Sequence, residues 1–225
     1  MKTFFIPLFL SLLIISCNSS KAKSDSQELN ENISSVEVLQ VSKKKKLIID
    51  ESKLISAYFA SGCFWCVEAI YEHTKGVKEV ISGYAGGHTE NPTYESSNTG
   101  KTGHAEAVEV IYDSSIVSFK ELVDIYYGTQ NIEQVNGQGN DIGSQYRSII
   151  FYSDEIEFEI INNKIAELKS IGLNPAAEVK ENDRFWEAEG YHQDYERLHP
   201  NQSYIRAVSV PRLNRFKADF PELVK

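Results

Sequence analysis

The stretch that decides the fold runs Leu54-Ile55-Ser56-Ala57-Tyr58-Phe59-Ala60, then Ser61-Gly62, then Cys63-Phe64-Trp65-Cys66. The first seven residues have the β-branched and aromatic content of a strand. Ser61-Gly62 interrupts that pattern, and residues 63–75 predict a helix that ends at Gly76. The sequence therefore places two cysteines on the first turn of a helix that directly follows a strand.

Strand and helix patterns continue downstream of this junction. Strands are predicted over 77–82, 105–112, 146–152 and 177–179, and helices over 119–127 and 155–171. Glycine-containing loops occupy 83–103 and 136–143, and the tail from Trp186 is aromatic and irregular. This mixture predicts an α+β fold: a two-layer sandwich of a mixed sheet and packed helices, with a long C-terminal wrap.

The first 50 residues do not read as part of this domain, which we expect to cover 51–225. Met1-Lys2 precedes an apolar run over 4–15, which is too short to span a bilayer comfortably and is typical of a signal peptide covering 1–16. Residues 17–50 are rich in Ser, Lys, Glu and Asn and predict a disordered tether.

The end of the apolar run, Ile14-Ile15-Ser16-Cys17, resembles the lipobox of a bacterial lipoprotein. That resemblance implies cleavage before Cys17, a lipid on its sulfur, and an exported protein anchored to a bacterial membrane, facing the periplasm or the cell surface. The alternative is an uncleaved anchor or ordinary secretion, with Cys17 as a spare thiol.

Charge excludes one class of partner. The chain has 23 basic and 32 acidic residues and a net charge of -9, whereas binding to nucleic acid phosphates requires a basic face.

The Cys63-Cys66 pair predicts thiol chemistry. A cysteine on the first turn of a helix lies beside free backbone N–H groups and the positive end of the helix dipole, both of which favour the thiolate. Cys66, one turn later, is close enough to form a disulfide with Cys63. A zinc half-site is the weakest alternative, because His73, His88 and His104 show no paired ligand spacing. A thioredoxin-like disulfide carrier fits the strand-helix placement better, although the insert Phe64-Trp65 is bulky for one.

Five blocks decide between these alternatives by their order and spacing. They are Gly62-Cys63-Phe64-Trp65, Gly83-Tyr84-Ala85-Gly86-Gly87, Asn91-Pro92-Thr93-Tyr94, Gly103-His104-Ala105-Glu106, and Gly137-Gln138-Gly139-Asn140-Asp141-Ile142-Gly143-Ser144-Gln145-Tyr146-Arg147-Ser148. The series, over about 54–205, resembles the A-type peptide methionine sulfoxide reductases. The resemblance implies a ferredoxin-like fold and a monomer that reduces the S-epimer of methionine sulfoxide, free or in oxidised proteins and peptides. It also implies a thioredoxin-like dithiol as reductant and no bound cofactor or metal.

The same resemblance implies a role for each site residue. Cys63 attacks the sulfoxide sulfur, Glu106 supplies a proton to the oxygen, and Cys63 becomes a sulfenic acid that Cys66 resolves as a disulfide. A carboxylic acid with a raised pKa suits the role of Glu106. The remaining residues are expected to hold the substrate, with the methyl group against Phe64 and Trp65 and the oxygen near Tyr84, Tyr146 and Asp141.

The chain departs from the family pattern in two places. No cysteine follows Cys66, so resolution falls to Cys66 or to an outside thiol. A His-Asp-Pro block expected before the glycine-rich loop reads Gln130-Asn131-Ile132, which puts the geometry of that loop in question. The tail segment 188–193 does match and predicts a wrap over the site.

Overall fold

The computed structural model describes residues 49–225. The predicted signal peptide, the predicted lipid attachment at Cys17 and nearly all of the predicted tether therefore lie outside the described residues. Among residues 49–225, no helix is long and apolar enough to cross a membrane.

Six strands form one mixed sheet in the order β7-β6-β1-β3-β2-β8. Every pairing is antiparallel except the one between β6 and β7, which is parallel. The strands are β1 Leu54–Ala60, β2 Val77–Ala85, β3 Ala105–Asp113, β6 Ile149–Tyr152, β7 Glu178–Glu181 and β8 Phe185–Glu187. A separate hairpin, β4 Gly137–Gln138 and β5 Asp141–Ile142, lies within the predicted glycine-rich loop.

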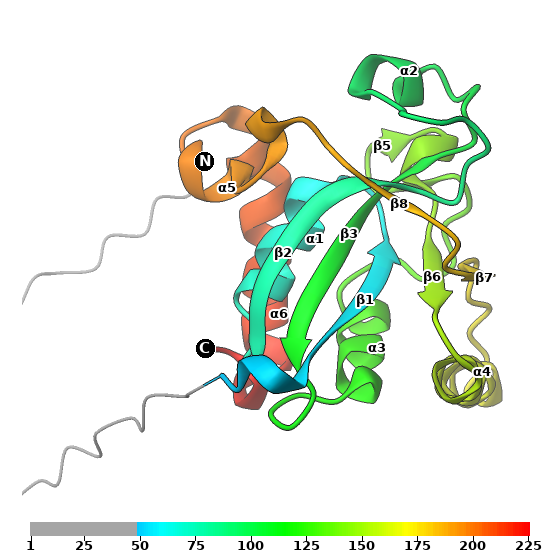
Figure 1. Ribbon diagram of the computed structural model, residues 1–225, viewed down its shortest axis with the longest axis vertical. Coiled ribbons are helices and arrows are strands. Elements are labelled where there is room, and N and C mark those ends of the chain that lie inside the picture. Colours follow the sequence, from blue (N-terminus) through cyan, green and yellow to red (C-terminus); the bar gives the residue numbers. More distant parts are fainter. Residues whose placement is uncertain (1–48) are drawn as a thin grey trace, which may run out of the picture. The chain divides into compact units, whose positions relative to one another are not determined.

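The helices pack against this sheet and against one another. They are α1 Phe64–Glu72, α2 Tyr94–Asn98, α3 Phe119–Gly128, α4 Glu155–Ser170, α5 Tyr195–Leu198 and α6 Val210–Asp219. α1 contacts β2, β3 and α6, and Figure 1 shows α1 and α6 side by side behind these strands. The predicted α+β architecture of a mixed sheet with packed helices is confirmed.

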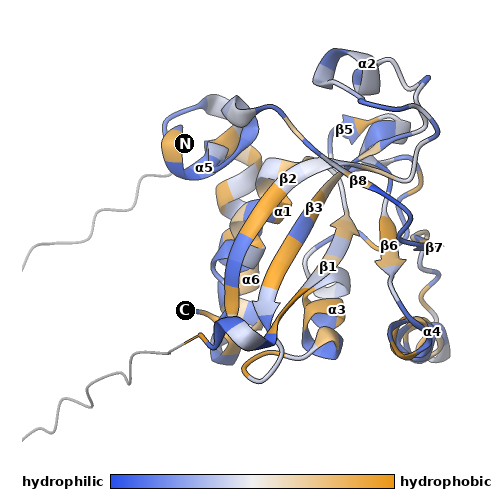
Figure 2. Ribbon diagram, in the orientation of Figure 1, coloured by the Kyte–Doolittle hydropathy of each residue, from blue (hydrophilic) through white to orange (hydrophobic). Residues whose placement is uncertain are grey.

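The core fills the space between the sheet and α1, α3 and α6. Phe59, Tyr71, Tyr112, Leu122 and Phe216 are among its members, each no more than 1% exposed. Figure 2 shows the corresponding apolar stretches along β2 and β3. The core anchors the β1–α1 junction, on which both thiols lie.

β2 continues beyond the predicted end at residue 82 to Ala85. The extension depends on Gly83, which pairs with Glu187 of β8. A Cβ at position 83 would lie 2.3 Å from both the Phe185 ring and the Trp186 carbonyl oxygen. The glycine that resembles a strand end in the sequence therefore allows an edge strand to approach.

The prediction of an irregular tail is wrong for its second half. A π-helical turn, Ile205–Ser209, runs directly into α6. Pro211, which resembles a helix breaker in the sequence, occupies the first turn of α6, where a missing N–H is tolerated. This helix buries Arg212, Leu213 and Phe216 against the rest of the domain.

Candidate active site

The two thiols lie where β1 turns into α1. Gly62 makes this turn with φ of +81°, and a Cβ on it would lie 2.6 Å from Cβ of Gln138 in the hairpin. Cys63 is the N-cap residue of α1, and Cys66 follows one turn later. Both are free thiols, 7% and 2% exposed, and the Cys63 side chain hydrogen-bonds to that of Cys66. The pair is thus buried, reduced and in mutual contact.

The N-terminus of α1 binds Glu106 rather than Cys63. The backbone N–H of Phe64 donates to Oε2 of Glu106 at 3.0 Å, whereas the Cys63 side chain makes no capping hydrogen bond. Glu106 is 3% exposed on β3. Its burial, together with the negative charge of Asp141, raises its pKa to about 8 against the opposing effect of the Phe64 N–H. The carboxyl therefore carries its proton at neutral pH.

The prediction that the helix N-terminus favours a Cys63 thiolate is wrong for this buried thiol pair. Burial raises the pKa of Cys63 well above its ordinary value, and the hydrogen bond to Cys66 acts in the same direction. The same hydrogen bond lowers the pKa of Cys66 to about 7, with help from the positive charge of Arg212. At rest, the more acidic thiol is Cys66.

One cavity of about 220 Å³ brings most of the predicted residues together. Cys63, Phe64, Trp65, Glu106, Asp141 and Tyr146 all line it. Tyr146 reaches it because residues 144–146 form a 3₁₀ turn before β6, whereas the sequence predicted that the strand begins there. Tyr94, Gln202 and Tyr204 complete the lining. A larger cavity of about 670 Å³, lined by α3 and α4 residues such as Lys120 and Lys164, contains neither thiol.

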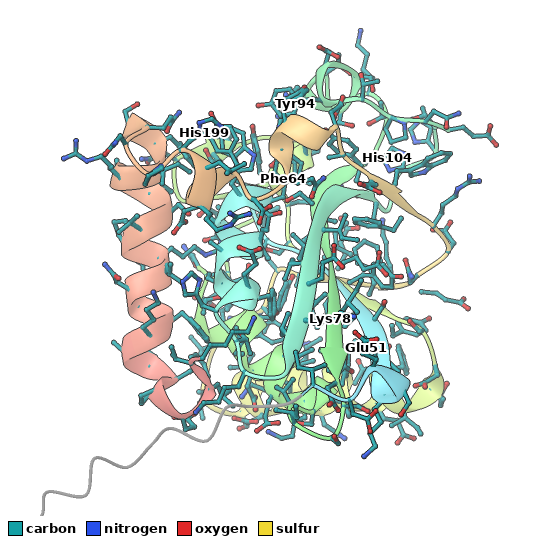
Figure 3. All side chains as sticks on the ribbon, turned by 60° about the vertical axis from the view of Figure 1, so that its left-hand side comes forward. Glu51, Phe64, Lys78, Tyr94, His104 and His199 are labelled. Carbon is teal, nitrogen blue, oxygen red and sulfur yellow. The ribbon has the colours of Figure 1, made fainter. Side chains whose placement is uncertain are left out.

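The structure corrects the assignment of Tyr84, which does not line this cavity. Its hydroxyl donates to Oε2 of Glu189 at 2.9 Å, and the tail covers the side chain completely. Tyr94, from the Asn91-Pro92-Thr93-Tyr94 block, takes the expected place, and its backbone N–H donates to the other oxygen of Glu189 at 2.9 Å. Figure 3 shows Phe64 and Tyr94 at the same end of the molecule, opposite Glu51 and Lys78.

The C-terminal tail fixes the two aromatic rings that follow Cys63. The Trp65 ring stacks on Tyr195 with centroids 3.8 Å apart, and its Nε1 donates to Nδ1 of His192 at 3.2 Å. The His192 ring also lies 4.9 Å from that of Phe64 and 4.6 Å from that of Tyr94. The predicted wrap of segment 188–193 over the site is therefore present in the structure.

Tyr204 is a site residue that the sequence did not indicate. Its hydroxyl donates to Oδ2 of Asp141 at 2.5 Å and lies 3.8 Å from Sγ of Cys66. The only signal in the sequence is the recurrence of Tyr204, Val208 and Arg212 every four residues, which Pro211 obscures.

One of the three histidines considered as zinc ligands, His104, has a structural role. The backbone N–H of Gly87 donates to Nδ1 of His104 at 3.2 Å, so Nε2 carries the proton and donates to the Thr89 carbonyl at 2.8 Å. Across residues 49–225, no three His, Cys, Asp or Glu side chains gather in a metal-binding arrangement.

Known proteins resemble this chain over the whole of the described domain. The family model "Peptide methionine sulfoxide reductase" matches residues 55–223. A peptide methionine sulfoxide reductase MsrA from Nautilia profundicola is 48% identical over 160 residues, covering 71% of this chain and 92% of the relative. One from Saccharolobus solfataricus is 45% identical over 170 residues, covering 75% and 96%.

Solved structures give the same result. Methionine sulfoxide reductase A of Corynebacterium diphtheriae superposes with a TM-score of 0.61 at 33% identity, over 67% of this chain and 77% of that one. Mxr1 from Saccharomyces cerevisiae in reduced form superposes with a TM-score of 0.63 at 28% identity, over 70% and 92%.

Proposed function

The chain belongs to the peptide methionine sulfoxide reductase family, and on that premise we propose how its own residues carry out the reaction. It is a peptide-methionine (S)-S-oxide reductase, which returns the S-epimer of methionine sulfoxide to methionine. The observation that carries the proposed mechanism is that a protonated carboxyl, Glu106, and a buried thiol, Cys63, line one small cavity with two fixed aromatic rings.

The methyl group and the oxygen of the substrate face different walls of the cavity. The methyl group packs against Phe64 and Trp65, which contributes ~0.8 kcal/mol for one buried carbon. The sulfoxide oxygen accepts hydrogen bonds from Glu106 and from the hydroxyls of Tyr94 and Tyr146. Such donors are most effective where negative charge develops, in a site that excludes water.

The first chemical step consumes no external proton. The Cys63 sulfur attacks the sulfoxide sulfur while Glu106 protonates the oxygen, and the proton released by the Cys63 thiol replaces the one that Glu106 gives up. In the resulting adduct the OH group passes from the substrate sulfur to the Cys63 sulfur, the S–S bond between the two breaks, methionine leaves, and Cys63 is left as a sulfenic acid. Because the pKa of Cys63 is raised in the free enzyme, its thiol is deprotonated only as the substrate oxygen accepts a proton.

Cys66 then resolves the sulfenic acid. Its sulfur attacks Cys63, a disulfide forms, and the oxygen leaves as water. A thioredoxin-like dithiol restores both thiols by two exchange steps and is itself oxidised. An outside reductant is needed because no further cysteine follows Cys66 that could reduce this disulfide.

We also propose that the enzyme is exported and held on a bacterial membrane by a lipid on Cys17. The support is the apolar run over 4–15 followed by Ile14-Ile15-Ser16-Cys17. Cys17→Ser in the full chain is expected to move the protein from the membrane fraction to the soluble fraction with unchanged specific activity. Membrane retention of that variant would contradict lipid anchoring through Cys17.

The mechanism is tested with the reduced enzyme and a peptide that carries one sulfoxide epimer. With dithiothreitol, only the S-epimer should be consumed, and Cys63→Ser should abolish turnover. Without reductant, the wild type should yield one methionine and an intramolecular disulfide, whereas Cys66→Ser should yield one methionine and a trappable sulfenic acid. Reduction of insulin disulfides without sulfoxide turnover would instead indicate the carrier alternative.

A further inference from the structure

Cys66 faces a second cavity of about 230 Å³ that is distinct from the substrate cavity. Both cysteines line it, but Cys66 does not line the substrate cavity. Arg212 and Arg215 bring two positive charges to its wall, and Asp141 brings a negative one. We call this the Cys66 cavity.

Arg212 is the unusual member of this wall, because it is a buried charge without a counter-ion. It is 5% exposed, and its Nε donates to the Thr129 carbonyl at 2.8 Å. Its two Nη groups donate to the carbonyl and the hydroxyl of Ser61, both at 2.8 Å. All three acceptors are neutral, and none of the ion pairs within residues 49–225 includes Arg212. A buried, unpaired charge is costly, so an anion that forms next to it is stabilised.

We propose that Arg212 is a positioning residue whose transient counter-ion is the thiolate of Cys66, formed once during resolution and once during regeneration. This inference rests on the proposed role of Cys66 as the resolving thiol. Arg212 touches neither substrate nor reductant, and acts only by setting which sulfur of the pair carries the negative charge.

In resolution, Arg212 stabilises the nucleophile. Cys66 attacks Cys63 sulfenic acid as a thiolate, the S–O bond breaks, and the departing hydroxide is protonated to water. The lowered pKa of Cys66, to which the charge of Arg212 contributes, keeps a fraction of this thiol ionised near neutral pH. The charged and titratable groups around Cys66 are Cys63, Glu106, Asp141, Tyr204, Arg212 and Arg215.

In regeneration, Arg212 stabilises the leaving group. The incoming thiolate attacks Cys63, the S–S bond breaks, and the electron pair leaves with Cys66, since the more acidic thiol leaves faster. The second thiol of the reductant then attacks the reductant sulfur of the mixed disulfide and releases Cys63. Two electrons and two protons pass from the dithiol to the cysteine pair. Cys63 is also the more exposed of the two residues, at 7% against 2%.

The first test measures resolution in single turnover, as disulfide formation after one equivalent of sulfoxide. Arg212→Gln should slow this step roughly fivefold to tenfold at pH 6.5, with the difference narrowing as pH rises toward 8, the range in which Glu106 still protonates the substrate. A neighbouring charge shifts a pKa by one to three units, and the weaker nucleophilicity of the more acidic thiol offsets part of that gain. Arg212→Lys, which keeps the charge, should restore the pH profile of the wild type.

Two other arginines of the same helical stretch provide matched controls. Arg215 lines the Cys66 cavity but is exposed, so Arg215→Gln should have a smaller effect than Arg212→Gln. Arg206 is exposed and lies two residues from both Tyr204 and Val208, so it is off the helix face that lines the cavity. Arg206→Gln should therefore have no effect on the resolution step. The methionine released in the first step reports that each variant is folded.

The second test traps the regeneration intermediate with a reductant that has a single thiol. Peptide mapping by mass spectrometry should locate the mixed disulfide on Cys63, and a mixed disulfide on Cys66 would overturn the assignment of the leaving group. An unchanged pH profile in Arg212→Gln, or one that Lys fails to restore, would overturn the role of Arg212. If the wild type forms no disulfide at all, the proposed role of Cys66 fails instead, and the two failures are distinguished.

Discussion

At the scale of single residues, Glu106 combines two properties that a proton donor to the sulfoxide needs. Its carboxyl is buried, which keeps the proton on it at neutral pH, and the Phe64 N–H fixes its orientation at 3.0 Å. The same N–H lies beside Cys63, so acid and nucleophile are positioned by a single helix end. The sulfoxide step needs both groups, so its rate depends on the protonation state of Glu106.

The first prediction concerns the fall of activity at alkaline pH, the alkaline limb of the pH profile. Since the pKa of Glu106 is raised to about 8, the rate of the sulfoxide step should fall as pH rises through that value. Glu106→Gln should lower this rate by about 10²- to 10⁴-fold, the usual contribution of a general acid, and should remove the limb. Single-turnover release of methionine between pH 6 and 10 measures both effects. Glu109→Gln, three residues along the same strand, is the control, and a limb that survives in Glu106→Gln would refute the assignment.

The second prediction separates two tyrosines that the motifs alone do not distinguish. Tyr94 lines the substrate cavity, so Tyr94→Phe should lower kcat/KM by about tenfold, which corresponds to one lost hydrogen bond of about 1.4 kcal/mol. Tyr84→Phe should leave kcat/KM nearly unchanged but lower stability by about 1 kcal/mol, because its hydroxyl binds Glu189. Steady-state kinetics and urea unfolding of both variants test this, and the reverse ranking in kcat/KM would favour the original assignment of Tyr84.

The contrast between these tyrosines shows what motif order leaves open. The sequence blocks assign Cys63 and Glu106 to one reaction, and the structure brings both to one cavity. The blocks say nothing about side-chain direction, and direction decides between Tyr84 and Tyr94. Tyr204 and Arg212 lie outside every block, so their contribution depends on tertiary packing that local sequence does not reveal.

At the scale of elements, the tail is held to the sheet by the Gln193 side chain, which makes hydrogen bonds like those of a neighbouring strand. The Ser82 N–H donates to Oε1 of Gln193 at 2.8 Å, and Nε2 of Gln193 donates to the Ser82 carbonyl at 3.0 Å and the Ala188 carbonyl at 3.1 Å. These bonds continue the β2–β8 pairing past the end of β8. The adjacent residue, His192, contacts both rings that follow Cys63.

The third prediction is that Gln193→Ala loosens both the tail and the substrate wall. It leaves partly buried polar groups of Ser82 and Ala188 without partners, so it should destabilise the fold by about 1–3 kcal/mol. It should also raise KM, since His192 no longer fixes Trp65. Urea unfolding and steady-state kinetics measure the two effects. Asn163→Ala, which removes an exposed amide on α4, is the control, and equal stabilities of the two variants would contradict the role of Gln193.

Element boundaries are predictable here where a single local signal decides them. Ser118 and Glu121 form a capping box at the start of α3, and Asp154 caps α4, so both helices begin where the sequence places them. Boundaries that depend on a distant partner are not predictable in this way. β2 extends through Gly83 where β8 packs on it, and the two ends of the segment 130–148 are joined by Ser148, which donates to Oε1 of Gln130 at 2.7 Å.

At the scale of the whole molecule, burial has raised the pKa of several carboxyl groups, and the two raised highest lie in separate places. Glu106 lies in the site, while Glu68 lies on α1, where it accepts the Asp194 N–H at 3.0 Å. Burial is the main cause in both cases, and each pKa is raised to about 8. Between their ordinary pKa near 4.5 and this value, the folded protein holds protons that the unfolded chain has lost.

The fourth prediction follows from the sign of these shifts. A raised folded-state pKa contributes stability that is fully present below the unfolded value and is lost as pH rises to the folded one, so the thermal midpoint should fall between about pH 4.5 and pH 8. His192 acts in the opposite direction, because burial lowers its pKa and its protonation below about 6.5 opposes the native state. One imidazole does not outweigh two carboxyl groups, so the decline should be shallower below pH 6.5 and steeper above it. Differential scanning calorimetry of the wild type and Glu68→Gln tests this. Since glutamine has no proton to lose, the variant should show a shallower decline between about pH 4.5 and pH 8, and an equal decline in both proteins would show that Glu68 titrates alike in the folded and unfolded states.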